Sequence, residues 1–106
     1  MSRKLELVVW PKLRKGIEFG QTLDCLAGVL QDYCSGLEIE RSESENSYTI
    51  KAVWKNPEQM DQMMRSKEFS VLSGAIAALC DRSEIRIDGK PVETDIAGLS
   101  AIAKKN

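Results

Sequence analysis

The spacing of apolar residues changes twice along the first third of the chain. Residues 4–10 (KLELVVW) alternate in part and then become apolar, which predicts a strand that Pro11 ends. Residues 16–34 instead repeat apolar side chains every three or four positions, which predicts a helix, and Ser35-Gly36 is a typical helix stop. The predicted helix stripe consists of Phe19, Leu23, Leu26, Leu30 and Tyr33.

A β-hairpin is predicted next, because alternation returns on both sides of a polar turn. Residues 37–43 and 47–54 alternate, and the turn SESEN lies between them. In the second strand one side carries mostly large apolar residues and the other carries mixed ones. The apolar side consists of Tyr48, Ile50, Ala52 and Trp54, and the other of Thr49, Lys51 and Val53.

A second helical segment follows the hairpin. Asn56 can cap it, Pro57 suits its first turn, and Gln59 gives a spacing like that of a capping box. We expect a break near Arg65-Ser66, after which the helix resumes to Leu79. Residues 83–87 (SEIRI) predict a short strand before an Asp-Gly turn, and residues 92–106 predict a weak terminal helix or tail.

The predicted order is strand, helix, strand, strand, helix, strand. Right-handed crossovers turn this order into a split β-α-β sheet with both helices on one face, an α+β, ferredoxin-like sandwich. The chain shows no linker, repeat or low-complexity segment, so we expect a single domain over residues 1–106, with its core at about 4–88.

The sheet face away from the helices is expected to be mostly charged, with an apolar spot at Val8, Trp10 and Val53. Such a face either meets water or is covered by a partner. Large apolar side chains grouped on a polar face favour partial coverage by a second subunit, so we expect these three residues at a homodimer interface.

Charge and composition exclude several classes of protein. The 15 basic and 16 acidic residues nearly cancel, so we expect no nucleic-acid partner. No apolar run is long enough for a membrane span and no signal sequence is visible, so we expect no membrane partner and a cytoplasmic location. The three cysteines are scattered and the chain has no histidine, so we expect buried thiols and no metal site. The seven glycines form no nucleotide-binding or flavin-binding pattern, so we expect no cofactor.

The segment AVWKNPEQMDQMMRSKEFSVLSGAIAAL resembles the second half of antibiotic biosynthesis monooxygenase (ABM) domains. In that family a strand ending in tryptophan leads into a helix with an R-S-x-E-F break and then a G-A-I stretch. Upstream, KGIEFGQTLDCLAGVL is similar to the family's first helix, so the resemblance covers about residues 4–88. The matching residues are Trp54, Arg65, Ser66, Glu68, Phe69, Gly74, Ala75 and Ile76.

The resemblance implies a homodimer in which two sheets form a shared dimeric α+β barrel. It also implies an activity, since members include cofactor-independent oxygenases of quinols and phenols as well as haem-degrading enzymes. This chain departs from the pattern at two positions. Met63 stands where many members carry histidine, and Val9 stands where the haem-degrading branch has asparagine. Without histidine, a histidine-ligated haem is excluded.

An aromatic or quinol ligand would, by this resemblance, meet residues of the strand that ends in tryptophan and of the helix after it. Core packing is the competing interpretation for each of them. We identify no catalytic residue: a carboxylate base needs burial to raise its pKa, and Glu6, Glu38, Glu40, Glu68 and Asp88 are only options. The predicted substrate-binding residues are Trp54, Tyr48, Met60, Met63, Met64 and Phe69.

Two functions remain open at this point, and a third is less favoured. The first is a cofactor-independent oxygenase, and the second is a non-catalytic dimeric module of the same fold that binds a ligand or assembles. The third, a monomeric RNA-binding domain, fits poorly with the near-neutral charge and the few aromatic residues expected on the open face.

Overall fold

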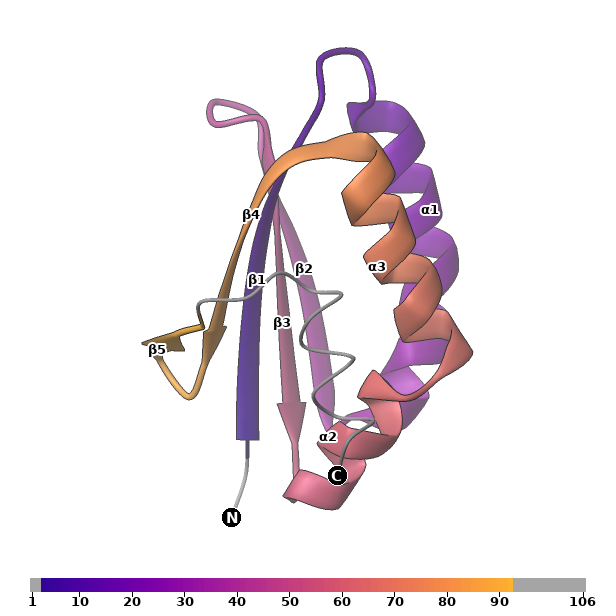
Figure 1. The fold of residues 1–106 in the computed structure, drawn as a ribbon, viewed down its shortest axis with the longest axis vertical. Helices are drawn as coiled ribbons and strands as arrows, with labels where there is room; N and C mark the ends of the chain where they lie inside the picture. The colour runs from indigo at the N-terminus through magenta and orange to yellow at the C-terminus, as the bar shows by residue number, and fades with distance from the viewer. Residues whose placement is uncertain (1–2, 93–106) are drawn as a thin grey trace.

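The computed structural model describes residues 3–92. These residues form a five-stranded antiparallel sheet in the order β2-β3-β1-β4-β5. Helices α1 and α3 lie on one side of the sheet and α2 lies at its lower end (Figure 1). The elements are β1 Arg3–Pro11, α1 Gly16–Leu30, the 3-10 helix η1 Gln31–Tyr33, β2 Gly36–Ser42, β3 Ser47–Trp54, α2 Pro57–Met64, α3 Lys67–Leu79, β4 Cys80–Ile87 and β5 Lys90–Pro91.

This arrangement confirms the predicted α+β, ferredoxin-like fold and the placement of both long helices on one sheet face. The predicted alternation holds in the central strands, because after the first residue of each strand inward residues are buried and outward ones are half-buried or exposed. One hydrophobic core fills the space between sheet and helices. Its largest fully buried side chains are Trp54, Phe19, Phe69, Leu5, Leu7, Leu23, Leu30, Met63, Leu72 and Val9.

The predicted helix break is confirmed. Asn56 caps α2 by accepting a hydrogen bond from the Gln59 amide at 2.8 Å, and α2 ends at Met64. Ser66 then caps α3, accepting from the Phe69 amide at 3.1 Å and donating to the Met63 carbonyl at 2.6 Å. One serine therefore ends the first helix and begins the second.

Two boundary predictions are wrong, and one strand was not predicted. The α-helix from Gly16 ends at Leu30, and the last turn before the stop is a 3-10 helix. Strand β4 begins at Cys80 instead of residue 83, because its polar start pairs through the backbone with Trp10 and Pro11. The two-residue strand β5 has no counterpart among the predicted elements. Residues 93–106, predicted as a helix or tail, lie outside the described residues.

The expectation of buried cysteines holds only in part. Cys80 is buried and Cys34 is half-buried, but Cys25 is exposed. Cys25 follows buried Leu23 by two positions, which is about 200° around the helix, so its side chain points away from the sheet.

Candidate functional site

The predicted substrate-binding residues fall at two opposite ends of β3. Trp54 is the last residue of this strand and Tyr48 is the second. Six residues of extended chain separate them by about 20 Å. The two side chains point to the same sheet face, but they are too far apart to contact one small ligand.

Trp54 lies at the lower end of the sheet, where β3 leads into α2 (Figure 1). Its side chain is fully buried, and its indole Nε1 is buried without a hydrogen-bond partner. A buried N–H donor normally finds an acceptor, because an unsatisfied donor loses the hydrogen bond that water provides. The Trp54 indole therefore presents an unused donor inside this end of the core.

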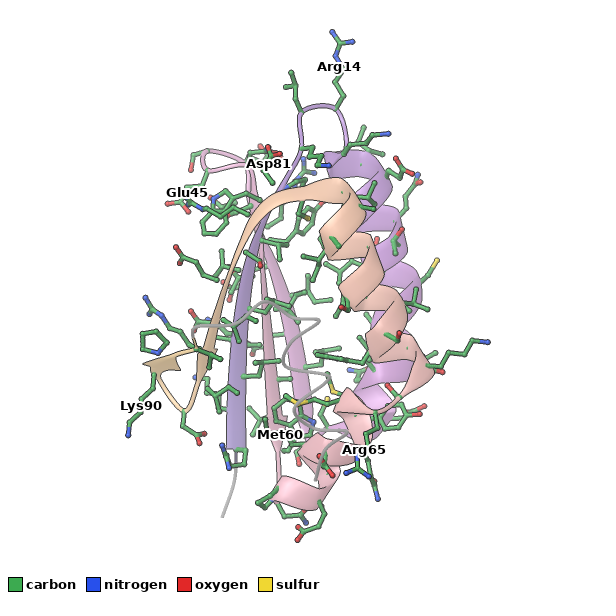
Figure 2. All side chains as sticks on the ribbon, viewed as in Figure 1. Arg14, Glu45, Met60, Arg65, Asp81 and Lys90 are labelled. Carbon is green, nitrogen blue, oxygen red and sulfur yellow. The ribbon has the colours of Figure 1, made fainter. Side chains whose placement is uncertain are left out.

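Sulfur-containing and aromatic side chains fill the same core around this end. Met63 and Met64 of α2 and Phe69 of α3 are buried, and Met60 is half-buried against the core (Figure 2). Helix α2 contacts both β3 and α3, so its methionines lie between the tryptophan strand and the second long helix. Methionine side chains are flexible and adjust to irregular spaces.

Tyr48, at the other end of β3, is held in a different environment. Its hydroxyl donates to the Gly16 carbonyl at 3.3 Å, and its ring packs edge-on against Phe19 with centroids 5.5 Å apart. The Arg41 guanidinium lies 5.7 Å from the ring centroid. Tyr48 thus connects β3 to the start of α1.

The carboxylates that we considered as general bases lie towards the surface. Glu38, Glu40 and Asp88 are exposed, and Glu6 and Glu68 are half-buried. Across residues 3–92 the buried polar side chains are only Ser47 and Ser73. Two of the carboxylates form ion pairs, Glu40 with Lys51 at 3.8 Å and Asp88 with Arg3 at 2.8 Å. The described core thus contains no carboxylate that burial would turn into a base at neutral pH.

The thiols of buried Cys80 and half-buried Cys34 are protonated at neutral pH, because the pKa of each is raised. The pKa of Cys80 is raised to about 11, mainly by burial and also by the nearby Asp81 carboxylate, while Lys12 opposes the change. Burial also raises the pKa of Cys34, against a lowering by a backbone hydrogen bond from Gly36. Because the thiolate is the nucleophile, neither thiol suits covalent catalysis. Within the described part of the chain, no three cysteine, aspartate or glutamate side chains gather as metal ligands.

The predicted interface residues lie on the open sheet face, but at two places along it. Val8 and Trp10 are neighbours on the same face of β1. Val53 pairs instead with Lys4 near the start of β1, about 20 Å from Trp10. All three side chains are half-buried, and a shallow hollow over the Val53 end includes Lys4, Gly36 and Lys51 in its lining.

The sequence did not indicate the partner of Trp10 on this face. Arg82 of β4 pairs with Trp10 in register and places its guanidinium 3.9 Å from the indole centroid, a cation–π contact. The sequence pattern predicts a strand that begins at residue 83, one position after Arg82, whereas in the structure Arg82 belongs to β4. The residue opposite Val8 on the same strand is Glu84, so charged side chains border the apolar pair on the β4 side, while Thr49 of β3 lies opposite Val8 on the other side.

Comparisons with known proteins give a likeness of fold and not of sequence. No protein-family model and no curated protein matches the chain. A conserved protein from Methanosarcina mazei Go1 superposes with a TM-score of 0.75 at 20% identity, covering 85% of this chain and 93% of its own. A candidate antibiotic biosynthesis monooxygenase from Nitrosomonas europaea gives a TM-score of 0.75 at 10% identity, covering 88% and 93%.

A second candidate antibiotic biosynthesis monooxygenase, from Caulobacter crescentus CB15, gives a TM-score of 0.73 at 14% identity. It covers 81% of this chain and 86% of its own. The fold of this chain is therefore ABM-like over most of its length. At these identities the likeness concerns the backbone and carries no activity from one protein to the other.

Proposed function

We propose that this protein is a homodimer with an ABM-like fold that binds a small aromatic or quinol ligand beside Trp54. The dimer is supported by the sheet, which the described helices cover on one face only, and by the half-buried Val8 and Trp10 on the other (Figure 1). Pairing two such faces would complete a dimeric α+β barrel and remove these apolar side chains from water.

The unsatisfied indole N–H of Trp54 is the observation that carries the ligand proposal. A quinone carbonyl or a phenolic oxygen accepts a hydrogen bond from such a donor, and the ring of the ligand packs against methionine and aromatic side chains. A hydrogen bond of this kind contributes about 1 kcal/mol, which is roughly a fivefold change in affinity. Met60, half-buried on α2, gives the ligand a side chain that moves easily at the rim of the site.

For the chemistry, we propose cofactor-independent oxygenation of a ligand that ionises readily. A phenolate transfers an electron to O2, and recombination forms a carbon–oxygen bond and a hydroperoxide. Loss of water then leaves a carbonyl, so one oxygen atom enters the product and the other leaves as water, with all four electrons supplied by the substrate. Because the described core offers no buried carboxylate, we propose substrates acidic enough to ionise near neutral pH.

Oxygen uptake with a panel of quinols and hydroxylated polycyclic aromatics tests this function. Trp54→Phe keeps an aromatic ring and removes the N–H, so the Kd of the active ligand should rise about fivefold. Trp10→Phe makes the same change on the open face and should leave the Kd unchanged. Equal affinities in the wild type and Trp54→Phe would exclude the Trp54 site.

A second candidate, a non-catalytic dimeric module, is favoured by the positions of the polar groups. The Tyr48 hydroxyl already donates to the Gly16 carbonyl, and the carboxylates lie towards the surface. This function predicts that a ligand raises the melting temperature without any oxygen uptake. A ligand present at a hundred times its Kd adds about 2.7 kcal/mol of stability, which a thermal shift detects. Oxygen uptake that depends on the same ligand would exclude the non-catalytic function.

A further inference from the structure

The loop between β1 and α1 is a protruding turn with an unusual surface. Leu13 is 86% exposed at its tip, and Ile17, in the first turn of α1, is 74% exposed. Lys12, Arg14 and Lys15 are exposed around them. Figure 2 shows Arg14 projecting beyond the rest of that end of the molecule.

The backbone holds this loop in one conformation. The Lys15 amide donates to the Lys12 carbonyl at 2.9 Å, which closes a four-residue turn, and the Lys12 amide donates to the Leu79 carbonyl at 2.7 Å. Arg14 has φ 68°, a left-handed conformation that usually favours glycine. A large cationic side chain therefore occupies a position where glycine would fit with less strain.

The charges near the loop favour an anionic partner approached from its tip. Glu45 and Asp81 lie at the same end but farther back than Arg14 (Figure 2). Two more acidic side chains lie near the loop: Glu18 pairs with Lys15 at 3.3 Å, and the exposed Glu43 lies in the same turn as Glu45. A flat surface that meets this end of the molecule along the direction in which Arg14 projects would meet the tip of the loop, at Leu13 and Arg14, before Glu45 or Asp81 (Figure 2).

We propose that this loop docks the protein on the surface of a membrane rich in anionic phospholipids. Leu13 and Ile17 would enter the boundary between headgroups and acyl chains while Lys12, Arg14 and Lys15 contact the headgroups. A protein partner is a poorer fit, since a stable protein interface needs about 800 Å² per partner and this tip is convex and narrow. The proposal is independent of the Trp54 site.

This proposal revises the expectation of no membrane partner, which rested on the absence of a span. Among the helices of residues 3–92, none is long and apolar enough to cross a membrane. Surface docking needs no span, only exposed apolar side chains next to cations. With one loop and three cations, we expect reversible binding that weakens as salt is raised.

Vesicle co-sedimentation of the full chain tests the loop. The vesicles contain either phosphatidylglycerol mixed with phosphatidylcholine or phosphatidylcholine alone, and binding is expected only to the first, at low salt. Arg14→Asn removes the charge with a residue that tolerates φ 68°, and it should weaken binding about fivefold. The double variant Leu13→Ser/Ile17→Ser should abolish sedimentation.

Matched controls separate the loop from general effects. Lys90→Ser removes an exposed cation far from the loop, and Val71→Ser removes an exposed apolar side chain from α3, so both should bind as the wild type does. Glu18→Gln removes the anion that pairs with Lys15, so it should strengthen binding about fivefold.

Three results would overturn the proposal. They are undiminished sedimentation of the Leu13→Ser/Ile17→Ser variant, equal binding to both kinds of vesicle, and no binding to either. Capture of the wild type by an acidic polypeptide, without vesicle binding, would identify an acidic protein as the partner in place of a membrane.

Discussion

Gly20, in the second turn of α1, leaves room for the hydroxyl of Tyr48. A Cβ atom at position 20 would lie 2.5 Å from the Tyr48 hydroxyl oxygen and 3.4 Å from the next ring atom. The first distance is too short for any real contact and the second is an ordinary one. The close approach between α1 and β3 at this point therefore requires both glycine at position 20 and tyrosine at position 48.

Gly20→Ala should accordingly destabilise the wild type by about 1–2 kcal/mol, because overpacking exceeds the gain in helix propensity. In a Tyr48→Phe background the same change should be neutral or stabilise by up to about 1 kcal/mol, since the hydroxyl is gone. Urea unfolding of the four proteins measures the coupling. Equal effects of Gly20→Ala in both backgrounds would contradict this account.

Cys80 makes stability depend on alkaline pH. Its pKa is raised in the folded state from 9.0 to about 11, so the folded protein holds a proton that the unfolded chain releases. The contribution of the Cys80 thiol to the free energy of unfolding is therefore complete below about pH 9. It is lost as the pH rises towards 11, by at most about 1.4 kcal/mol per pH unit.

The comparison with Cys80→Ala isolates this effect from other groups that titrate in alkaline solution. The free energy of unfolding of the wild type should fall more steeply than that of Cys80→Ala across this pH range. Parallel curves for the two proteins would show that the thiol does not titrate between the two states.

Two capping side chains set where α2 and α3 begin: Asn56 lies at the start of α2, and Ser66 lies at the junction of α2 and α3. Ser66 accepts from the Phe69 amide and donates to the Met63 carbonyl, while Asn56 accepts from the Gln59 amide. Gln59 also uses its side-chain oxygen to accept from the Lys55 amide at 2.9 Å. The break between the helices is thus stabilised by hydrogen bonds and is not a defect in one long helix.

Ser66→Ala and Asn56→Ala should each destabilise the fold by about 1 kcal/mol. Ser70→Ala, an exposed change in the first half of α3, serves as the control and should cost nothing measurable. Differential scanning calorimetry measures the three. A loss at Ser70 equal to that at Ser66 would show that the serine cap has no special role.

The sequence predicts an element well when the spacing of its side chains defines it, and poorly when backbone pairing defines it. The sequence predicts the hairpin and both long helices because alternation or helical spacing marks each one, and it predicts the cap at Asn56 and a break near Arg65-Ser66. The start of β4 was missed because its polar residues join the sheet through backbone pairing with Trp10 and Pro11. The same register brings Arg82 against Trp10, so the hydrophobic pattern of the sequence shows neither the start of β4 nor the Arg82–Trp10 contact.

The candidate site was predicted less well, for a geometric reason. Tyr48 and Trp54 share a face of β3, and the sequence shows this, but sharing a face does not bring residues together. Strand rise alone separates them, and it separates Val53 from Trp10 in the same way. The unsatisfied indole of Trp54 depends on the packing of three elements around it and has no signature in the sequence.

In the proposed dimer, the open sheet face is the surface at which a single substitution should change the assembly most. Trp10→Glu places a charge beside Val8 on that face, and burying it in an interface costs several kcal/mol. We expect a monomer at micromolar concentration, measured by light scattering after size-exclusion chromatography. The control Val71→Glu changes an exposed residue of α3 and should remain dimeric.

A Trp10→Glu variant that stays fully dimeric would exclude this interface. A wild type that is itself monomeric would exclude the dimer altogether and leave the open face in water. In either case the membrane-docking loop lies at one end of the molecule, outside the strands of that face, and its test stays valid.

The central position of β1 has a consequence for synthesis of the chain. This strand is made first, yet its two neighbours, β3 and β4, extend to Trp54 and Ile87. At about 5–20 residues per second, a ribosome needs roughly 4 to 17 s to pass from one end of this sheet to the other. For that time the nascent β1 exposes unpaired backbone on at least one edge. A ribosome that stalls before Cys80 therefore leaves a product whose apolar central strand has at least one unpaired edge, which makes it a substrate for chaperones or a seed for aggregation.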